Sequence, residues 1–283
     1  MPSLARTILL TGVTLIAFAA NSLLTRMALG AGSIDAASFM TLRLASGAVM
    51  LSAIMAISQR QPPSKKQRPW SAALMLFLYA VTFSFSYLQL AAGTGALILF
   101  GTVQVTMILA ALKQGETPQL LEWMGLALAL VGLVYLVSPG LAAPPVLGSG
   151  LMVMAGVAWG LYSLLGRGAG DPVAYTTTNF VRTVPLALGV SLVSLPQLQV
   201  SVVGVLLAML AGALASGVGY SLWYAALKGL TATRAATVQL AVPVIASVGG
   251  ILFLQEALTA RLAVASVMVL GGIGLAVMGR SGG

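Results

Sequence analysis

The sequence of 283 residues contains no cysteine, no histidine and only five acidic residues. Without cysteine, the chain has neither a disulfide framework nor a thiolate metal site. Without histidine, it lacks the commonest metal ligand and the usual proton-transfer group. It also lacks the G-x-x-x-x-G-K-S/T loop that binds nucleotide phosphates. We therefore expect no metal, no cofactor and no use of ATP.

Charged residues are rare, and apolar residues dominate the composition. Hydrophobic residues make up 59% and charged residues 7% of the chain, and the mean hydropathy is +1.03. An average soluble domain carries about 25% charged residues, so this composition indicates a membrane protein. A spanning helix needs about 20 apolar residues, and the length therefore allows roughly ten spans. The net charge of +9 comes from basic residues between apolar runs, which favours lipid headgroups over nucleic acid as partners.

The apolar runs divide the chain into ten predicted transmembrane helices, as in an all-α polytopic membrane protein. Residues 58–69 combine prolines with several Lys and Arg side chains, which predicts a solvated loop. Residues 139–148 are rich in proline and glycine and carry no charge, which is typical of a linker. The predicted spans are 7–25, 35–57, 70–91, 95–112, 119–137, 149–165, 173–194, 202–226, 232–254 and 260–279.

A polar pattern occurs twice in the chain. The segment AFAANSLLTR ends at Arg26, and AWGLYSLLGR ends at Arg167 with Ser, Leu, Leu and Arg in the same order. This repeated pattern predicts a duplication, with a first five-helix repeat at 1–138, a linker at 139–148 and a second five-helix repeat at 149–283. The offsets between matched residues are 141 from Ser22 to Ser163, 140 from Glu116 to Glu256 and 139 from Arg43 to Arg182.

The odd number of spans in each repeat determines how the two repeats are related. Because five helices end on the side opposite to their start, the second repeat enters the membrane inverted relative to the first. Inverted repeats predict alternating access to a site between them. A cytoplasmic N-terminus satisfies the positive-inside rule and places the C-terminus on the same side. The cytoplasmic basic residues are then Arg6, Arg60, Lys65, Lys66, Arg68, Lys113, Arg167, Lys228, Arg234 and Arg280, whereas Arg26 and Arg261 lie outside.

Each repeat ends in an acidic residue followed by a glycine-bearing helix. The two segments are GETPQLLEWMGLALALVGLVYLV from Gly115 and QEALTARLAVASVMVLGGIGLAVM from Gln255. They resemble the paired EamA domains of the drug/metabolite transporter superfamily, and the resemblance covers nearly the whole chain. The tract FSFSYLQLAAGTGALILFGTVQVTMI, from Phe83 to Ile108, is similar to bacterial exporters of aromatic amino acids in that superfamily. The resemblance implies a multi-pass transporter of the bacterial inner membrane.

Aromatic and amide side chains inside the predicted helices are candidates for a substrate cavity. Rings at i, i+4 and i+8 on one helix face offer the apolar wall that small-molecule pockets usually have. The alternative is an aromatic belt at headgroup depth, which we expect for Trp223 and Tyr224. The amides of Gln104 and Gln239 either bind substrate or join helices. The candidates are Asn21, Tyr79, Phe83, Tyr87, Gln104, Trp159, Tyr162, Tyr220 and Gln239.

Two arginines lie inside predicted spans, where a charge is costly. Arg43 and Arg182 each cost about 2.5–3.5 kcal/mol at mid-helix on insertion scales, so each needs a compensating partner. That partner is either a substrate carboxylate or the backbone carbonyls of a neighbouring helix end.

Proline and glycine residues within the predicted helices are candidate hinges. Pro185 and Pro243 each remove a backbone N–H inside a helix and interrupt it. Gly217 and Gly219 add flexible points. These positions serve either as hinges for a conformational change or as static kinks. A glycine pair, Gly156 and Gly160, has the GxxxG spacing that lets a second helix pack closely.

All five acidic residues lie at or near predicted span ends, so none has a clear claim to carry a coupling proton at mid-membrane. Glu116 and Glu256 each precede a helix, where a negative charge stabilises the helix dipole by about 0.3–1 kcal/mol. We therefore expect structural roles for both glutamates. We also expect a facilitative carrier that is driven by the gradient of its own substrate.

The leading hypothesis is an exporter of neutral amino acids, aromatic ones included, that works through a largely apolar cavity between the repeats. Export of other small metabolites or of cationic drugs is the alternative within transport. An intramembrane enzyme is the alternative from a different class, but the chain lacks H-E-x-x-H, paired mid-span aspartates and a histidine base. The expected partners are a small-molecule substrate and the lipid bilayer. The sequence leaves the oligomeric state open, with a monomer among the options.

Overall fold

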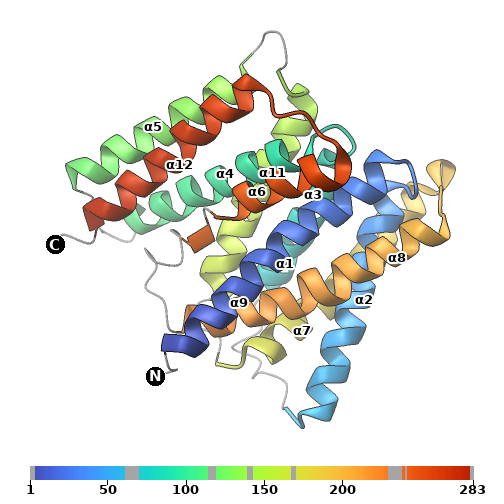
Figure 1. The fold of residues 1–283 in the computed structure, drawn as a ribbon. Coiled ribbons are helices and arrows are strands. Elements are labelled where there is room, and N and C mark those ends of the chain that lie inside the picture. Colours follow the sequence, from blue (N-terminus) through green and yellow to red (C-terminus); the bar gives the residue numbers. More distant parts are fainter. Residues whose placement is uncertain are drawn as a thin grey trace.

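The computed structural model describes residues 4–60, 70–113, 119–138, 143–166, 170–228, 238–239 and 241–280. These ranges are helical apart from short connections (Figure 1). Most of the predicted loop at 58–69 lies outside the described residues. So do Glu116, Arg167, Arg234 and the first part of the predicted linker.

Ten long helices run through the described ranges, as the sequence predicts. One of them is composed of α8 (Val202–Leu210), a π-helical segment η3 (Ala211–Val218) and α9 (Gly219–Leu227), which follow one another without a break. A short 3-10 turn, η2 (Leu195–Gln197), precedes this helix. The others are α1 (Leu4–Gly30), α2 (Ala36–Ile57), α3 (Trp70–Ser86), α4 (Ala92–Lys113), α5 (Leu120–Val137), α6 (Val146–Gly166), α7 (Pro172–Val193), α11 (Ala241–Leu254) and α12 (Ala260–Arg280).

The helices have the length and surface of membrane spans. Among the described residues, five helices are long and apolar enough to cross a membrane, and further apolar helices are shorter. Apolar side chains such as Val202 (77% exposed) and Phe253 (70% exposed) face outwards. Exposed apolar surface of this kind is unfavourable in water and is typical of contact with lipid. The five candidate spans are Ala5–Gly30, Ala36–Ile57, Ala92–Ala110, Val146–Gly166 and Val202–Leu227. The predicted all-α polytopic fold class is confirmed.

Polar residues at the helix starts explain where several helices begin. Asp35 accepts a hydrogen bond from the backbone N–H of Ser38 at 2.8 Å and caps α2. Asp171 caps α7 in the same way. Pro172 follows at the first helical position, where a backbone N–H would have no partner within the helix, so proline is well tolerated there. Ser201 caps α8. These caps satisfy backbone donors that lipid leaves unsolvated.

Helices from the two repeats interlock rather than forming two separate lobes. The most extensive packing joins α5 to α12, α3 to α6 and α2 to α7, and each of these pairs takes one helix from either repeat (Figure 1). Gly156 and Gly160 of α6 bring that helix close to Thr102 and Thr106 of α4, which is the packing that their spacing predicts.

Connections that are equivalent in the two repeats lie at opposite ends of the bundle. The α1–α2 connection pairs with the segment between α7 and α8 through a backbone bridge from Ile34 to Val200. At the far end of α2, Arg60 forms an ion pair with Asp171 at the start of α7. In the predicted duplication the α1–α2 connection corresponds to the α6–α7 connection, and an inverted second repeat requires these two connections to lie at opposite ends.

Candidate functional site

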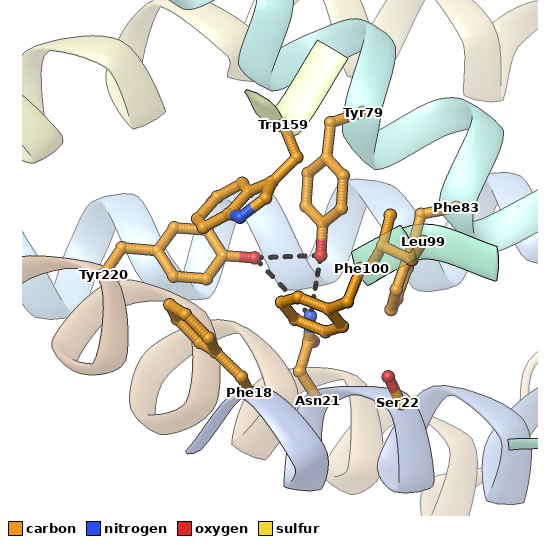
Figure 2. A pocket seen from close by; sticks show the side chains of 9 residues that line it. All are labelled: Phe18, Asn21, Ser22, Tyr79, Phe83, Leu99, Phe100, Trp159 and Tyr220. Atoms are coloured by element: carbon orange, nitrogen blue, oxygen red, sulfur yellow. Dashed lines mark hydrogen bonds between the residues drawn. The ribbon is translucent and has the colours of Figure 1, made fainter. Parts of the chain in front are cut away.

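A small buried cavity lies in the middle of the bundle, between helices α1, α3, α4, α6 and α9. Its volume is about 10 Å³, which holds about one water and no amino acid. Aromatic rings from both repeats form most of its wall (Figure 2). The lining residues are Phe18, Asn21, Ser22, Tyr79, Phe83, Leu99, Phe100, Trp159 and Tyr220.

A hydrogen-bond network at the cavity ties three helices together. The Asn21 side-chain N–H group donates to the Tyr79 hydroxyl at 3.0 Å and to the Tyr220 hydroxyl at 3.4 Å (Figure 2). Tyr220 in turn donates to Tyr79 at 3.2 Å, and the Ser216 hydroxyl donates to the Asn21 side-chain oxygen Oδ1 at 3.3 Å. Because buried polar groups in a membrane need partners, this network fixes the polar side of the cavity.

The residues that meet in the cavity are equivalent positions of the two repeats. Tyr220 follows Tyr79 by 141 positions, and Trp159 follows Phe18 by 141 positions, the same offset as Ser163 from Ser22. Tyr79 and Tyr220 share a hydrogen bond. The rings of Phe18 and Trp159 lie 5.5 Å apart in an edge-on contact. Equivalent residues touch each other only near the axis that relates two repeats, so the cavity lies on the pseudo-two-fold axis.

A continuous file of aromatic rings extends from the cavity in both directions. On one side, the ring centre of Phe83 lies 5.0 Å from that of Tyr79 and 4.8 Å from that of Tyr87. On the other side, Trp159 contacts Tyr162 at 5.6 Å. Beyond Tyr162, the rings of Tyr175 and Tyr224 complete the file. Aromatic side chains therefore close the cavity on both sides.

Arg43 of α2 lies directly against this file. Its guanidinium carbon is 5.3 Å from the ring centre of Tyr79 and 4.9 Å from that of Phe83, and the residue is fully buried. Among the described residues, its three side-chain nitrogens have no hydrogen-bond partner. Desolvated cation–π contacts are worth about 2 kcal/mol, whereas an unpaired buried ion costs several kcal/mol. The alternative that Arg43 bonds backbone carbonyls is therefore wrong within the described part of the chain.

Polar contacts join three connections at one end of the bundle, which we call the Glu256 end. Both carboxylate oxygens of Glu256 accept from the backbone N–H of Ala92 at 2.9 Å. The Arg26 Nε atom lies 3.4 Å from Glu256, and its Nη1 donates to the Tyr87 carbonyl at 3.1 Å. Glu256 therefore caps α4 of the first repeat. The prediction that it stabilises the helix following it in sequence is wrong in that detail, because the α11–α12 connection folds back over the start of α4.

The opposite end, which we call the Asp171 end, is also closed by charged contacts. Arg60 Nη1 donates to both carboxylate oxygens of Asp171 at 2.9 Å, and the Lys228 ammonium donates to the Gly170 carbonyl at 2.6 Å. Burial opposes ionisation of Asp171, but hydrogen bonds from the Ala174 backbone N–H and from Arg60 outweigh it, and the pKa of this carboxyl is lowered. These contacts join the end of α2 to the start of α7 and the end of α9.

The structure gathers most, but not all, of the residues that the sequence singled out. Asn21, Tyr79, Phe83, Trp159 and Tyr220 line the cavity. Tyr87 and Tyr162 lie along the aromatic file. Gln104 and Gln239 are buried elsewhere.

Arg182 does not join the cavity. It is half-buried on α7, and its guanidinium carbon lies 4.7 Å from the ring centre of Trp70 at the start of α3. The two arginines that match in sequence therefore have different surroundings. Only Arg43 contacts cavity-lining rings.

The predicted hinge residues occupy unlike positions. Helix α7 continues through Pro185, which lies inside it. Pro243 is the third residue of α11. Gly217 lies in the π-helical segment η3 and Gly219 directly follows it. Such π-helical segments are rare and often mark functional sites, and η3 carries the Ser216 that bonds Asn21.

Two aromatic residues lie deeper than the sequence indicates. Trp223 is 1% exposed and packs edge-on against Phe18, and Tyr224 is 3% exposed and donates to the Tyr162 carbonyl. The prediction that both belong to an interfacial belt is wrong, because this face of α9 points into the bundle. Sequence reasoning also missed Phe18 and Phe100. The repeat offset pairs Phe18 with Trp159, and that signal identifies Phe18.

Comparisons with known proteins place this chain in a family. Residues 146–278 match the model of the EamA-like transporter family. An uncharacterized curated protein of Pseudomonas aeruginosa is 50% identical over 277 residues, which cover 98% of this chain and 96% of that protein. A solved crystal structure of a protein superposes with a TM-score of 0.67 at 19% identity, covering 94% of this chain and 98% of the other. At that identity, the superposition shows the fold alone.

The all-helical bundle, with several helices long and apolar enough to cross a membrane, is that of a multi-pass membrane protein. The chain belongs to the EamA-like transporter family. Membership implies membrane transport of small molecules, and the family consists of transporters rather than enzymes.

Proposed function

We propose that this protein exports neutral amino acids, aromatic ones included, across the bacterial inner membrane. In this proposal the repeats at 1–138 and 149–283 expose the central cavity alternately to either side, and both termini lie in the cytoplasm. The observation that carries the proposal is the aromatic-walled cavity with an amide–hydroxyl network on the pseudo-two-fold axis. Apolar walls with a few convergent polar groups suit a substrate that has an apolar side chain and a polar backbone.

The aromatic file supplies a route through the bundle. The substrate passes between the rings that close the cavity, towards the Glu256 end on one side and the Asp171 end on the other. Alternating access requires that only one end open at a time. The Arg26–Glu256 contact and the Arg60–Asp171 contact are therefore the closures that break in turn.

No coupling proton enters this mechanism. Among the acidic residues whose side chains the structure describes, Asp35, Asp171 and Glu256 all lie at the ends of the bundle and hold backbone N–H groups. Histidine is absent from the sequence. A carrier without a titrating group at its central site equilibrates its substrate down the substrate's own gradient.

A counterflow assay with purified protein in liposomes tests this function. Vesicles loaded with unlabelled phenylalanine should transiently accumulate external labelled phenylalanine and leucine without an imposed pH gradient. A requirement for a pH gradient would contradict the facilitative mechanism, and no accumulation of any neutral amino acid would contradict the substrate class.

A pair of tryptophan variants ties transport to the cavity. Trp159→Ala removes a cavity wall and should reduce counterflow at least about tenfold, because its ring contacts four other rings of the site. Trp123→Ala, at a tryptophan 48% exposed on α5, is the matched control and should retain transport. Equal losses of counterflow in both variants would contradict the proposal that the substrate passes through the cavity.

A further inference from the structure

The interior around the cavity offers hydrogen-bond donors without acceptors. All three side-chain nitrogens of Arg43 are buried without a hydrogen-bond partner in the described part of the chain. The indole nitrogens of Trp159 and Trp223 are buried in the same condition. An indole N–H and a guanidinium only donate, so the molecule that completes this region must bring acceptors.

The acidic side chains that the structure describes all lie away from this region. The carboxylates of Asp35, Asp171 and Glu256 are engaged at the ends of the bundle. Salt bridges in the described ranges join Arg26 to Glu256 and Arg60 to Asp171. Arg43 therefore presents a buried positive charge with aromatic faces beside it, and no carboxylate in the described part of the chain pairs with it.

We propose that Arg43 binds the carboxylate of the substrate, and that the site recognises apolar monocarboxylates whether or not they carry an amino group. This inference rests on the proposed function and specifies which part of the amino acid is recognised. A guanidinium forms two parallel hydrogen bonds to a carboxylate, which fixes its orientation as well as its charge. The aromatic file then holds the apolar remainder of the molecule.

The position of Arg43 explains how the cavity couples binding to opening. Arg43 does not line the cavity of about 10 Å³, but its guanidinium lies against Tyr79 and Phe83, which do. A substrate fits only after these rings move apart. Their movement brings the guanidinium into the enlarged site, and the substrate carboxylate replaces the two ring faces as its partner.

The amino group of the substrate finds much weaker recognition. The described site offers it the Asn21 side-chain oxygen, which already accepts from Ser216, and the hydroxyls of Ser22, Tyr79 and Tyr220. An ammonium ion leaving water without a carboxylate partner gains little from neutral acceptors. Loss of the amino group should therefore matter less than loss of the carboxylate.

Three compounds with the same phenyl ring distinguish recognition of the carboxylate from recognition of the amino group in the wild-type protein. Phenylalanine carries both groups, 3-phenylpropionate lacks the amine and 2-phenylethylamine lacks the carboxylate. As competitors of phenylalanine counterflow, phenylpropionate should act within about threefold of phenylalanine, and phenylethylamine at least about tenfold more weakly. Phenylethylamine competing as well as phenylpropionate would overturn the inference, even if no variant folds.

Substitutions assign the preference to Arg43. Arg43→Gln should remove the difference between phenylpropionate and phenylethylamine, and Arg43→Lys should restore part of it because the charge remains. Arg182→Gln is the control and should keep the wild-type ranking. A folded Arg43→Gln protein that keeps the ranking would refute the role of Arg43.

Direct binding separates this inference from the proposed function. Labelled 3-phenylpropionate should bind the purified wild-type protein in detergent, and Arg43→Gln should weaken that binding at least about tenfold. Binding that depends on Arg43, without any amino-acid counterflow, would refute amino-acid export and retain the carboxylate site. Amino-acid counterflow without binding of phenylpropionate would do the reverse.

Discussion

In the proposed mechanism, the negative charge of Glu256 holds the Glu256 end closed. Glu256 accepts from the Ala92 N–H with both oxygens at 2.9 Å and lies 3.4 Å from the Arg26 Nε. Replacing it with glutamine keeps one acceptor but removes the charge from both contacts. A charge-assisted hydrogen bond is worth about 1.5–3 kcal/mol and a neutral one about 1 kcal/mol, and the start of α4 adds about 0.3–1 kcal/mol for a negative charge. Glu256→Gln should therefore favour opening of this end by about 2 kcal/mol.

A shift of about 2 kcal/mol corresponds to a roughly 30-fold change in the ratio of open to closed molecules. The absence of cysteine allows a clean measurement, because Ser22→Cys introduces the sole thiol, at a cavity-lining position that is 1% exposed. A membrane-impermeant maleimide applied from the Glu256 side should label this cysteine about 30-fold faster when Glu256→Gln is also present.

Asp35→Asn is the matched control for this measurement. Asp35 lies at the same end and also caps a helix, but it contacts Ser38 and Gln199 rather than Arg26. Its replacement should change the labelling rate less than about threefold. An unchanged rate in Glu256→Gln, or equal increases in both variants, would show that Glu256 does not hold this end closed.

Three further changes test the centre, the packing and the opposite end. Single and double replacement of Tyr79 and Tyr220 by phenylalanine should show a coupling of about 0.6–1.5 kcal/mol in unfolding free energy, since the two hydroxyls share a hydrogen bond; additive effects would contradict that bond. Gly212→Ala should destabilise the protein by about 1–3 kcal/mol, because its Cβ would collide with the backbone of α2, whereas Gly150→Ala meets nothing within 4 Å and should be neutral. Asp171 has a lowered pKa, so its stabilisation should be complete above about pH 5 and lost as the pH falls through the folded-state pKa; a thermal-unfolding difference from Asp171→Asn that does not shrink in acid would refute this.

The sequence predicts the helices well because the bilayer constrains them. A span must be apolar over about 20 residues and must satisfy its own backbone hydrogen bonds, so hydropathy alone places α2 at 35–57, against Ala36–Ile57 in the structure. The residue pattern also predicts which side chains reach the centre. Asn21 is polar inside the repeated motif, which predicts a position in the cavity, and its side chain donates to both central tyrosines.

Long-range pairing was not predictable from the sequence. The sequence predicts that Glu256 stabilises the helix that follows it. In the structure Glu256 instead caps α4, which begins 164 positions earlier. Similarly, Trp223 and Tyr224 sit where an aromatic belt is expected, and only the rotation of α9 shows that they point inwards. Local patterns give the position of a residue along the membrane normal. They do not give its direction around the helix when every face is apolar.

The two repeats agree at the axis and differ beside it, and this difference bears on selectivity. Tyr79 and Tyr220 occupy positions 141 residues apart and share a hydrogen bond, so both halves of the chain contribute the same group to the centre. Arg43 and Arg182 also match in sequence, but one guanidinium is fully buried against Phe83 and the other lies over the ring of Trp70, away from the cavity. A carrier with two central arginines would suit a doubly charged anion. One buried arginine suits a single carboxylate, which leaves the aromatic walls to select the side chain.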